Sequence, residues 1–407
     1  MRAKHEKYLL ELTGLPTAAG REDRVIAWVE HWAGRRKTVG LSRDKFGNLL
    51  LKRAGAKSNK PIIITAHMDH PAFVVTGQES PRRITAEFRG GVDDSYFVGS
   101  RVRLHLGGGI EPCRGRVLKL EPPKEAGGDK RVLVELVRPV VAEVGDVMVW
   151  DLPAPKIARG RLRAPVCDDL AGVAAGLAAF EALLKERVNR VHLDVRLLLT
   201  RAEEVGFIGA IGACKSGLIP KGARLIALEN SRSFAESPIG GGPIIRVGDR
   251  TSSFDPDLTY RIGLVAQSIQ QSDPDFKWQR KLMPGGTCEA SAYQALGYTA
   301  TCLCLPLGNY HNMKPKAEAD ASRDNKPKTT GKSKGKPGEK SGGGGLEIAG
   351  DGGGRGKIDS ETIAVADYHG LIRLLIETGR RLDDKTKAPT LKDRLGPLFA
   401  RRRGLLH

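Results

Sequence analysis

The chain has 407 residues, 40% of them hydrophobic and 5% aromatic, which suits one large domain and a smaller one with mainly aliphatic cores. No apolar run approaches the roughly 20 residues of a membrane-spanning helix, so no membrane partner is expected. Much of the net charge of +19 lies in a Lys-rich stretch and at the C-terminus, away from aromatic residues, and nucleic acid is therefore not expected as a main partner.

The N-terminal part of the chain has the pattern of two helices followed by two strands. Apolar residues recur at helical spacing over 4–13 and 21–35. Strands are expected over 48–55 and 61–69. The second contains a continuous apolar run, which is typical of a strand covered on both faces.

The next segment, 75–160, has a different sequence pattern. Short β-like runs alternate with Gly and Pro, and no long helical pattern occurs. This pattern predicts a small all-β module inserted into the main fold.

From residue 161 onward, strand and helix patterns alternate. Strands are expected in three segments, and helices in five. The expected strands are 191–200, 223–229 and 298–307, and the expected helices are 170–186, 205–217, 255–272, 288–297 and 360–382. Such alternation predicts an α/β fold with a mixed open sheet flanked by helices.

We therefore divide the chain into three parts. Residues 1–74 and 161–384 form the main α/β domain, 75–160 an inserted β-barrel-like domain, and 385–407 a basic C-terminal tail. Within the main domain, about 314–357 is rich in Lys and Gly and almost free of large apolar side chains, which predicts a disordered surface loop. The alternative is a tether or an anion-binding arm.

The six cysteines form no CxxC pair, and the charged, amphipathic N-terminus has no apolar signal core. Reduced thiols in a chain of this length are typical of a cytoplasmic protein. We therefore expect a cytoplasmic location.

Acidic and histidine side chains cluster in the sequence where buried elements end or begin. The carboxyl ends of parallel strands gather functional groups at one edge of an open sheet. Five segments each deliver such groups to this edge: His67 and Asp69, Asp168 and Asp169, Glu203 and Glu204, Glu229, and His311.

This set has the composition of a two-metal site. Two divalent ions need about three protein ligands each, and one carboxylate can bridge both ions. A neighbouring carboxylate that binds neither ion can accept a proton. Each residue alone has a plainer explanation: Asp169 as a helix N-cap, the Glu203–Glu204 pair as a solvated turn, and His311 as a turn residue.

The motifs "AHMD", "CDDLAG", "AEEVGFIGA" and "NYHNM", in that order, resemble the glutamyl and deblocking aminopeptidase family of cocatalytic zinc peptidases. The resemblance implies a zinc-exopeptidase-like fold and hydrolysis of N-terminal residues from peptide substrates. It also implies two divalent metal ions, zinc with cobalt or manganese as alternatives, and a large homo-oligomer.

The resemblance implies how the metal ligands are shared. His67 and Glu229 would bind one metal, and Glu204 and His311 the other. Asp168 would bridge the two ions.

The remaining roles also follow from the resemblance. Glu203 would be the catalytic general base. Asp69 would orient His67 through a hydrogen bond, which fixes the imidazole tautomer. A cis peptide bond is implied between Asp168 and Asp169.

Two positions depart from the family pattern. Glu229 stands where an aspartate is common, and its longer arm changes the reach to the metal. Cys288, in a loop expected to line the substrate site, also replaces a common aspartate. Both departures keep an alternative open, in which the same scaffold serves a deacylase or amidohydrolase that acts on a non-peptide amide.

Overall fold

The computed structural model describes residues 2–107, 110–123, 125, 127–188, 191–315 and 356–406. The Lys- and Gly-rich insertion predicted over about 314–357 lies, apart from its two ends, outside the described residues.

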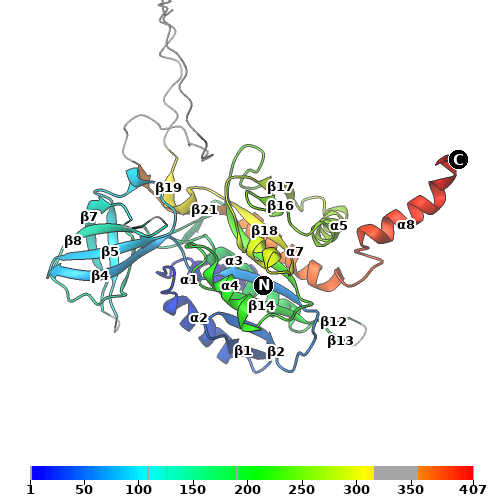
Figure 1. The fold of residues 1–407 in the computed structure, drawn as a ribbon, viewed down its shortest axis with the longest axis horizontal. Helices are drawn as coiled ribbons and strands as arrows, with labels where there is room; N and C mark the ends of the chain where they lie inside the picture. Colours follow the sequence, from blue (N-terminus) through cyan, green and yellow to red (C-terminus); the bar gives the residue numbers. More distant parts are fainter. Residues whose placement is uncertain are drawn as a thin grey trace, which may run out of the picture.

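The main part of the molecule is built on an eight-stranded mixed sheet (Figure 1). The order across the sheet is β1 (Val39–Arg43), β2 (Leu49–Arg53), β14 (Val195–Thr200), β3 (Ile62–His67), β15 (Arg224–Arg232), β18 (Thr299–Leu307), β16 (Ile244–Asp249) and β17 (Gln279–Met283). The four central strands β14, β3, β15 and β18 are mutually parallel, so their carboxyl ends meet at one edge. The predicted fold class, a mixed open sheet flanked by helices, is confirmed.

Helices cover both faces of this sheet. One face carries α1 (Arg2–Leu12), α2 (Asp23–Gly34), α3 (Leu170–Leu183), α5 (Pro256–Ser272) and α7 (Val365–Arg381), and the other carries α4 (Ile208–Ser216) and α6 (Glu289–Ala295). Because side chains alternate along a strand, Ile62 and Ile64 enter the first core and Ile63 the second. A strand covered on both faces must be apolar throughout, as the sequence of β3 is.

Helix α3 lies at the centre of the larger core. Its residues are mostly Ala, Gly and Leu, and nearly all are buried. A Cβ added at Gly176 would lie 2.8 Å from Cδ1 of Leu197, so the small residues allow the helix to lie close to the sheet. This packing brings the residues that precede α3, Asp168 and Asp169, to the edge where the strands end.

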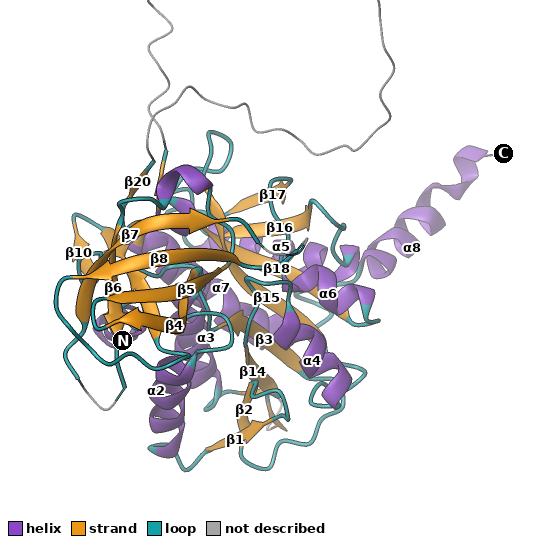
Figure 2. Ribbon diagram, turned by 60° about the vertical axis from the view of Figure 1, so that its left-hand side comes forward, coloured by secondary structure: helices purple, strands orange, loops and turns teal. Residues whose placement is uncertain are grey.

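A closed six-stranded antiparallel barrel lies beside the sheet (Figure 2). Its order is β4 (Ala72–Ser80), β5 (Arg83–Arg89), β8 (Lys130–Leu136), β7 (Cys113–Glu121), β6 (Arg101–His105) and β9 (Val147–Trp150). Phe73, Phe88, Phe97 and Trp150 form its aromatic centre. The barrel begins at Ala72, three residues before the region predicted to be all-β, and its last strand ends at Trp150, inside that region. The domain boundaries at 75 and 160 stay a prediction.

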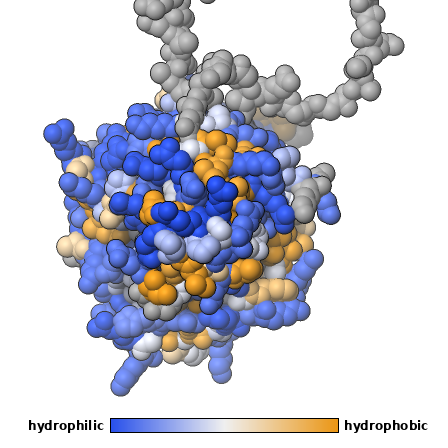
Figure 3. Space-filling view, turned by 90° about the vertical axis from the view of Figure 1, so that its left-hand side faces the viewer, coloured by the Kyte–Doolittle hydropathy of each residue, from blue (hydrophilic) through white to orange (hydrophobic). Residues whose placement is uncertain are grey.

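Hydrophobic side chains lie among the charged ones on the barrel side of the molecule (Figure 3). Among the barrel residues, Val137, Val141 and Val144 are 60%, 84% and 74% exposed. Single exposed apolar residues are common on protein surfaces and do not by themselves define an interface.

The remaining short elements are β10 (Lys156–Ala158), β11 (Arg161–Ala164), β12 (Arg187–Val188), β13 (Val191–His192), β19 (Met313–Lys314), β20 (Lys357–Ile358), β21 (Glu361–Ala364), η1 (Asp94–Tyr96) and η2 (Tyr310–Asn312). The helix predicted from residue 360 begins later, at Val365, because Glu361–Ala364 pair with β11 instead. Local pattern does not reveal this strand, since its partner lies about two hundred residues earlier.

The C-terminal segment, expected as a basic tail, contains helix α8 (Leu391–Arg402) and the 3-10 turn η3 (Arg403–Leu406). Within the described residues, no helix is long and apolar enough to cross a membrane. All six cysteines are free.

Candidate metal centre

The carboxyl edge of the central strands collects the predicted polar groups. His67 ends β3, Glu229 lies within β15, and Glu203 and Glu204 follow β14. His311 lies in η2, directly after β18. Asp168 does not directly follow a strand; it lies two residues before the start of α3.

Asp168 lies at the centre of this cluster. Its Oδ1 is 3.4 Å from Nε2 of His67, and its Oδ2 is 3.6 Å from Nε2 of His311. Oε1 of Glu229 lies 3.8 Å from the His67 nitrogen, and Oε1 of Glu204 lies 3.5 Å from the His311 nitrogen. The five side chains therefore form two groups, one around each histidine, that share the Asp168 carboxylate.

The backbone around His311 has an unusual conformation that turns its ring toward the cluster. Asn309, His311 and Asn312 all have positive φ, at 55°, 54° and 64°. Nδ1 of His311 lies 2.6 Å from the carbonyl oxygen of Gly91, to which it can donate a hydrogen bond. In the neutral imidazole with Nδ1 as the donor, Nε2 carries no proton and faces Asp168 and Glu204.

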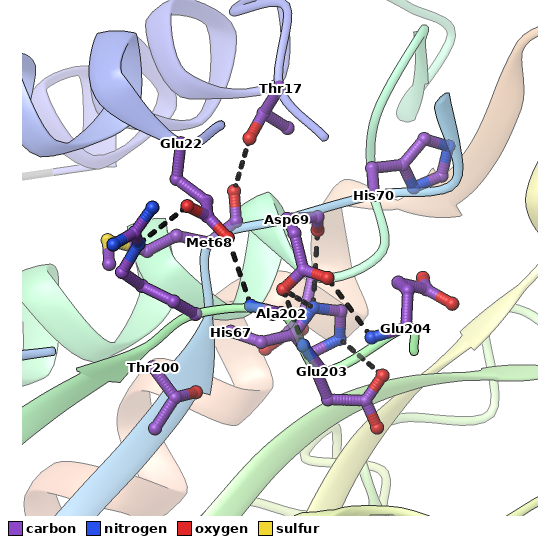
Figure 4. Close-up of polar contacts among 12 residues, drawn as sticks. Thr17, Glu22, His67, Met68, Asp69, His70, Thr200, Ala202, Glu203 and Glu204 are labelled. Atoms are coloured by element: carbon purple, nitrogen blue, oxygen red, sulfur yellow. Dashed lines mark hydrogen bonds and ion pairs between the residues drawn. The ribbon is translucent and has the colours of Figure 1, made fainter. Parts of the chain in front are cut away.

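Asp69 organises the other side of the cluster (Figure 4). Its Oδ1 and Oδ2 accept hydrogen bonds from the backbone N–H groups of Glu203 and Glu204, at 2.9 Å and 3.0 Å. Nδ1 of His67 lies 3.2 Å from the Asp69 carbonyl oxygen and 3.5 Å from its Oδ1. Asp69 thus holds the imidazole and both glutamates, a wider contact set than the sequence predicts.

Glu22, the residue before α2, also stabilises the turn that carries Glu203 and Glu204 (Figure 4). The sequence analysis did not select it. Its fully buried carboxylate accepts from the backbone N–H of Ala202 at 2.9 Å and from Nε of Arg201 at 2.6 Å. Ala202 has a φ of 51°, and these contacts hold that left-handed residue in place. An acidic residue near the start of a helix gave no distinct signal, because helix N-termini commonly carry acidic residues.

Glu361 is a second residue that the sequence analysis missed. Its Oε2 accepts from the backbone N–H groups of Cys167 and Asp168 at 2.6 Å and 3.0 Å, and its Oε1 accepts from that of His311 at 2.9 Å. A fully buried acidic residue therefore ties two of the cluster segments together. The available signal was an acidic residue two positions before the apolar run "IAVA".

His70 lies behind the cluster, immediately after the selected "AHMD" motif. Its Nδ1 is 2.6 Å from the carbonyl oxygen of Asp168, and its Nε2 is 3.1 Å from Oδ1 of Asn312. Burial lowers the pKa of His70 to about 4. The neutral ring supports the backbone of Asp168 without adding a charge.

Asp169 does not act as the helix cap that its position suggests. It occupies the N-cap position of α3, but its side chain makes no capping hydrogen bond and instead accepts from Nδ2 of Asn230 at 3.2 Å. The predicted cis peptide bond between Asp168 and Asp169 is present.

Burial and like charge make the carboxylates of the cluster difficult to ionise. Burial and the negative charge of Asp168 raise the pKa of Glu204 to about 8 and that of Glu229 to about 7. Burial would lower the pKa of His311, but Glu204 and Asp168 raise it to about 10. Burial raises the pKa of Glu203 well above its usual range. A cluster with this charge distribution favours bound cations.

The donor set fits divalent metal ions. Nε2 of His67, Oδ1 of Asp168 and Oε1 of Glu204 are buried and have no hydrogen-bond partner among the described residues. Three groups, His67–Asp168–Glu229, Asp168–Glu204–His311 and His67–Glu203–Glu204, each bring one ligand atom per residue within 4.8 Å of the others. Unpaired buried polar atoms cost stability unless a ligand satisfies them, and imidazole with carboxylate is a ligand set that zinc accepts.

Comparison with known proteins supports this interpretation. The model of the M42 glutamyl aminopeptidase family matches residues 135–321, which include Asp168, Glu204, Glu229 and His311 of the cluster. The predicted resemblance to the glutamyl aminopeptidase family is therefore confirmed.

Solved structures show the same fold. A TET aminopeptidase from a marine sediment archaeon of the Thaumarchaeota is 19% identical, with a TM-score of 0.68, and covers 94% of this chain and 98% of its own. An aminopeptidase from Desulfurococcus kamchatkensis is 21% identical, with a TM-score of 0.67 and coverage of 93% and 95%. The TET1 peptidase of Pyrococcus horikoshii is 18% identical, with a TM-score of 0.67 and coverage of 92% and 99%. The chain has the fold of these aminopeptidases over nearly their whole length.

Proposed function

We propose that this chain is a two-metal aminopeptidase that removes N-terminal residues from peptides. The observation that carries the proposal is the position of Asp168, whose two carboxylate oxygens each face a different histidine. His67 and Glu229 would hold one ion and Glu204 and His311 the other, with Asp168 between them. The family match supports the peptidase class.

The chain's own residues divide the catalytic work. Bound metal ions would supply an activated water and polarise the scissile carbonyl. Glu203 is the proposed general base, which accepts the proton of the attacking water and returns it to the leaving amine. Its Oε2 lies 4.0 Å from Nε2 of His67, and it forms one of the three possible metal-binding groups with His67 and Glu204, so its assignment as base and not as ligand is part of the proposal. Asp69 is a positioning residue that fixes Glu203, Glu204 and His67.

The test of the base is Glu203→Gln. Turnover of an aminoacyl-p-nitroanilide should fall by about 10²–10⁴-fold, because the amide cannot accept the proton. Elemental analysis should still find about two metal ions per chain. Glu135→Gln, at an exposed barrel position, is the matched control. If Glu203→Gln retains turnover, Glu203 is not the general base. If the variant loses metal, Glu203 is a metal ligand.

The second candidate function is a deacylase or amidohydrolase on the same scaffold. Glu229 in place of the family's aspartate favours it, because the longer arm changes the space beside His67. Cys288 gives less support, since its side chain is fully buried in the core between the sheet and helices α4 and α6, and its N–H donates to Asp249. A panel of free and N-acetylated aminoacyl substrates separates the two, since an aminopeptidase should cleave only those with a free α-amine.

We also propose zinc as the metal, a cytoplasmic location and a homo-oligomeric state. The Pyrococcus horikoshii relative can assemble into a tetrahedron or a large octahedral shell, which supports an assembly of several chains here. Six free thiols support a reducing compartment. Light scattering on the purified protein should give a mass that is a multiple of 44.0 kDa, and a monomer would contradict this part of the proposal.

A further inference from the structure

The C-terminal helix α8 and the turn η3 stand away from the body of the molecule in both ribbon views (Figures 1 and 2). Hydrogen bonds join the first turn of α8 to α5: Leu391 N donates to Asp257, at 2.9 Å, and Arg394 donates to the hydroxyl of Tyr260, at 2.7 Å. No residue of α8 or η3 is buried in the described chain. The helix is therefore anchored at one end and has no apolar surface of its own chain to pack against.

This helix has an apolar stripe. Leu395, Leu398 and Phe399 are 59%, 46% and 62% exposed, and Leu405 and Leu406 are each 76% exposed. At about 100° per residue, Leu391, Leu395, Leu398 and Phe399 of α8 occupy an arc of about 100°, and Leu405 and Leu406 follow in η3. An uncovered stripe of this width on a short helix is unfavourable in water.

Basic side chains border the stripe on both sides. Lys392 and Arg403 lie along one border, and Arg394 and Arg401 along the other. Arg402 lies within the stripe, where its long stem can extend toward either border. The segment 391–406 contains five basic residues and one acidic residue, and the face opposite the stripe is mainly small: Gly396, Ala400 and Gly404.

We propose that α8 and η3 bind an anionic lipid surface, with the helix lying in the plane of the interface. The apolar stripe would enter the boundary between headgroups and acyl chains, and the two basic borders would meet the anionic headgroups. The symmetry of the borders favours a flat charged surface over a protein groove, whose walls would desolvate the cations on both sides. At 12 residues, the helix is too short to span a bilayer, so the proposed partner is the surface of a membrane.

The test is co-sedimentation of the full chain with vesicles of phosphatidylcholine alone or with about one third phosphatidylglycerol. We expect binding to the anionic vesicles that weakens with added salt. The triple variants Leu395→Ser/Leu398→Ser/Phe399→Ser and Arg401→Gln/Arg402→Gln/Arg403→Gln should each reduce the bound fraction about tenfold. The variant Lys45→Gln/Lys57→Gln/Lys60→Gln removes the same charge from exposed body positions and should bind normally.

Three results would overturn the proposal. They are absence of binding to anionic vesicles, binding that survives the apolar triple substitution, and equal loss in the Lys45/Lys57/Lys60 control. Thermal unfolding of each variant checks that the body is intact. A lower assembly mass for the apolar triple variant without vesicles would show that α8 packs against a second copy of the chain instead.

Discussion

At the scale of single residues, the cluster depends on carboxylates that accept backbone N–H groups. Asp69 accepts from Glu203 and Glu204, and the two adjacent glutamates then face different histidines. Charge-assisted hydrogen bonds of this kind are short and directional, so they fix a turn more firmly than side-chain packing alone. This arrangement allows two adjacent residues to have different proposed roles, Glu203 as the base and Glu204 as a metal ligand.

Glu361 offers the sharpest residue-scale prediction. Glu361→Gln replaces one acceptor oxygen by an NH₂ group that cannot accept, so at least one of the N–H groups of Cys167, Asp168 and His311 loses its partner. Metal affinity should fall by about 10–100-fold. Competition with a chromophoric chelator measures this change.

Asp359→Asn is the matched control for Glu361→Gln. Asp359 lies two residues earlier and pairs with the exposed side chain of Arg163, so its substitution should leave metal affinity unchanged. If both variants bind metal as the unmodified chain does, Glu361 does not support the site.

At the scale of elements, the contact between α4 and the turn after β14 fixes the position of the glutamates. Gly209 N donates to the carbonyl oxygen of Arg201 at 2.8 Å, and Nδ2 of Asn48 donates to that of Gly209 at 2.9 Å. A Cβ at Gly209 would lie 2.2 Å from the Arg201 oxygen. Only glycine allows this approach, so the small-residue sequence of α4 serves the site as well as the core.

Gly209→Ala should therefore destabilise the fold by about 1–3 kcal/mol, because the backbone of Arg201 must move. Gly263→Ala in α5 is the matched control, since its added Cβ would meet no atom within 4 Å. Better helix propensity should make this variant more stable by about 0.5–1 kcal/mol. Denaturant unfolding followed by circular dichroism measures both, and equal effects of the two substitutions would contradict the close contact.

At the scale of the whole molecule, the barrel completes a site built on the sheet. Gly91, which accepts the hydrogen bond of His311, lies between the barrel strands β5 and β6. The hydroxyl of Tyr96 donates to the carbonyl oxygen of Lys314 at 2.8 Å, and Gly356 N donates to that of Ser95 at 3.0 Å. The barrel thus holds the chain segments on both sides of the insertion.

The charge of the cluster predicts how stability without metal depends on pH. The carboxyl groups of Glu204, Glu229 and Glu361 have folded-state pKa values of about 8, 7 and 8, above the ordinary 4.5. The folded state therefore binds more protons than the unfolded state between about pH 4.5 and 8, and stability falls as pH rises through this window. His311, raised from 6.5 to about 10, continues the fall at higher pH.

The melting temperature of chelator-treated protein should accordingly decrease from pH 5 to pH 8. Zinc should restore it, and the restoration should be larger at pH 8, because metal binding competes with protons. Differential scanning calorimetry with and without zinc measures both effects. A rise in melting temperature of the chelator-treated protein over this range would contradict the raised carboxyl pKa values.

The sequence predicted much of the α/β architecture because its strands are covered on both faces and must be apolar throughout. β3 and β18 were predicted to within a few residues. β1, β17 and β21 were not assigned, since short or edge strands have weaker patterns and depend on distant partners. β16, which lies inside the sheet, was also not assigned. Helix α8 was also missed, because Gly396 and Pro397 interrupt its helical pattern.

The sequence by itself determined which polar residues lie at the ends of buried strands, since a polar residue that follows an apolar run can be recognised without the structure. It did not reveal Glu22 or Glu361, whose main partners lie 180 and 194 residues away. Only the tertiary structure decides such contacts, because the packing of helices against the sheet determines which N–H groups come within hydrogen-bond distance of a buried carboxylate.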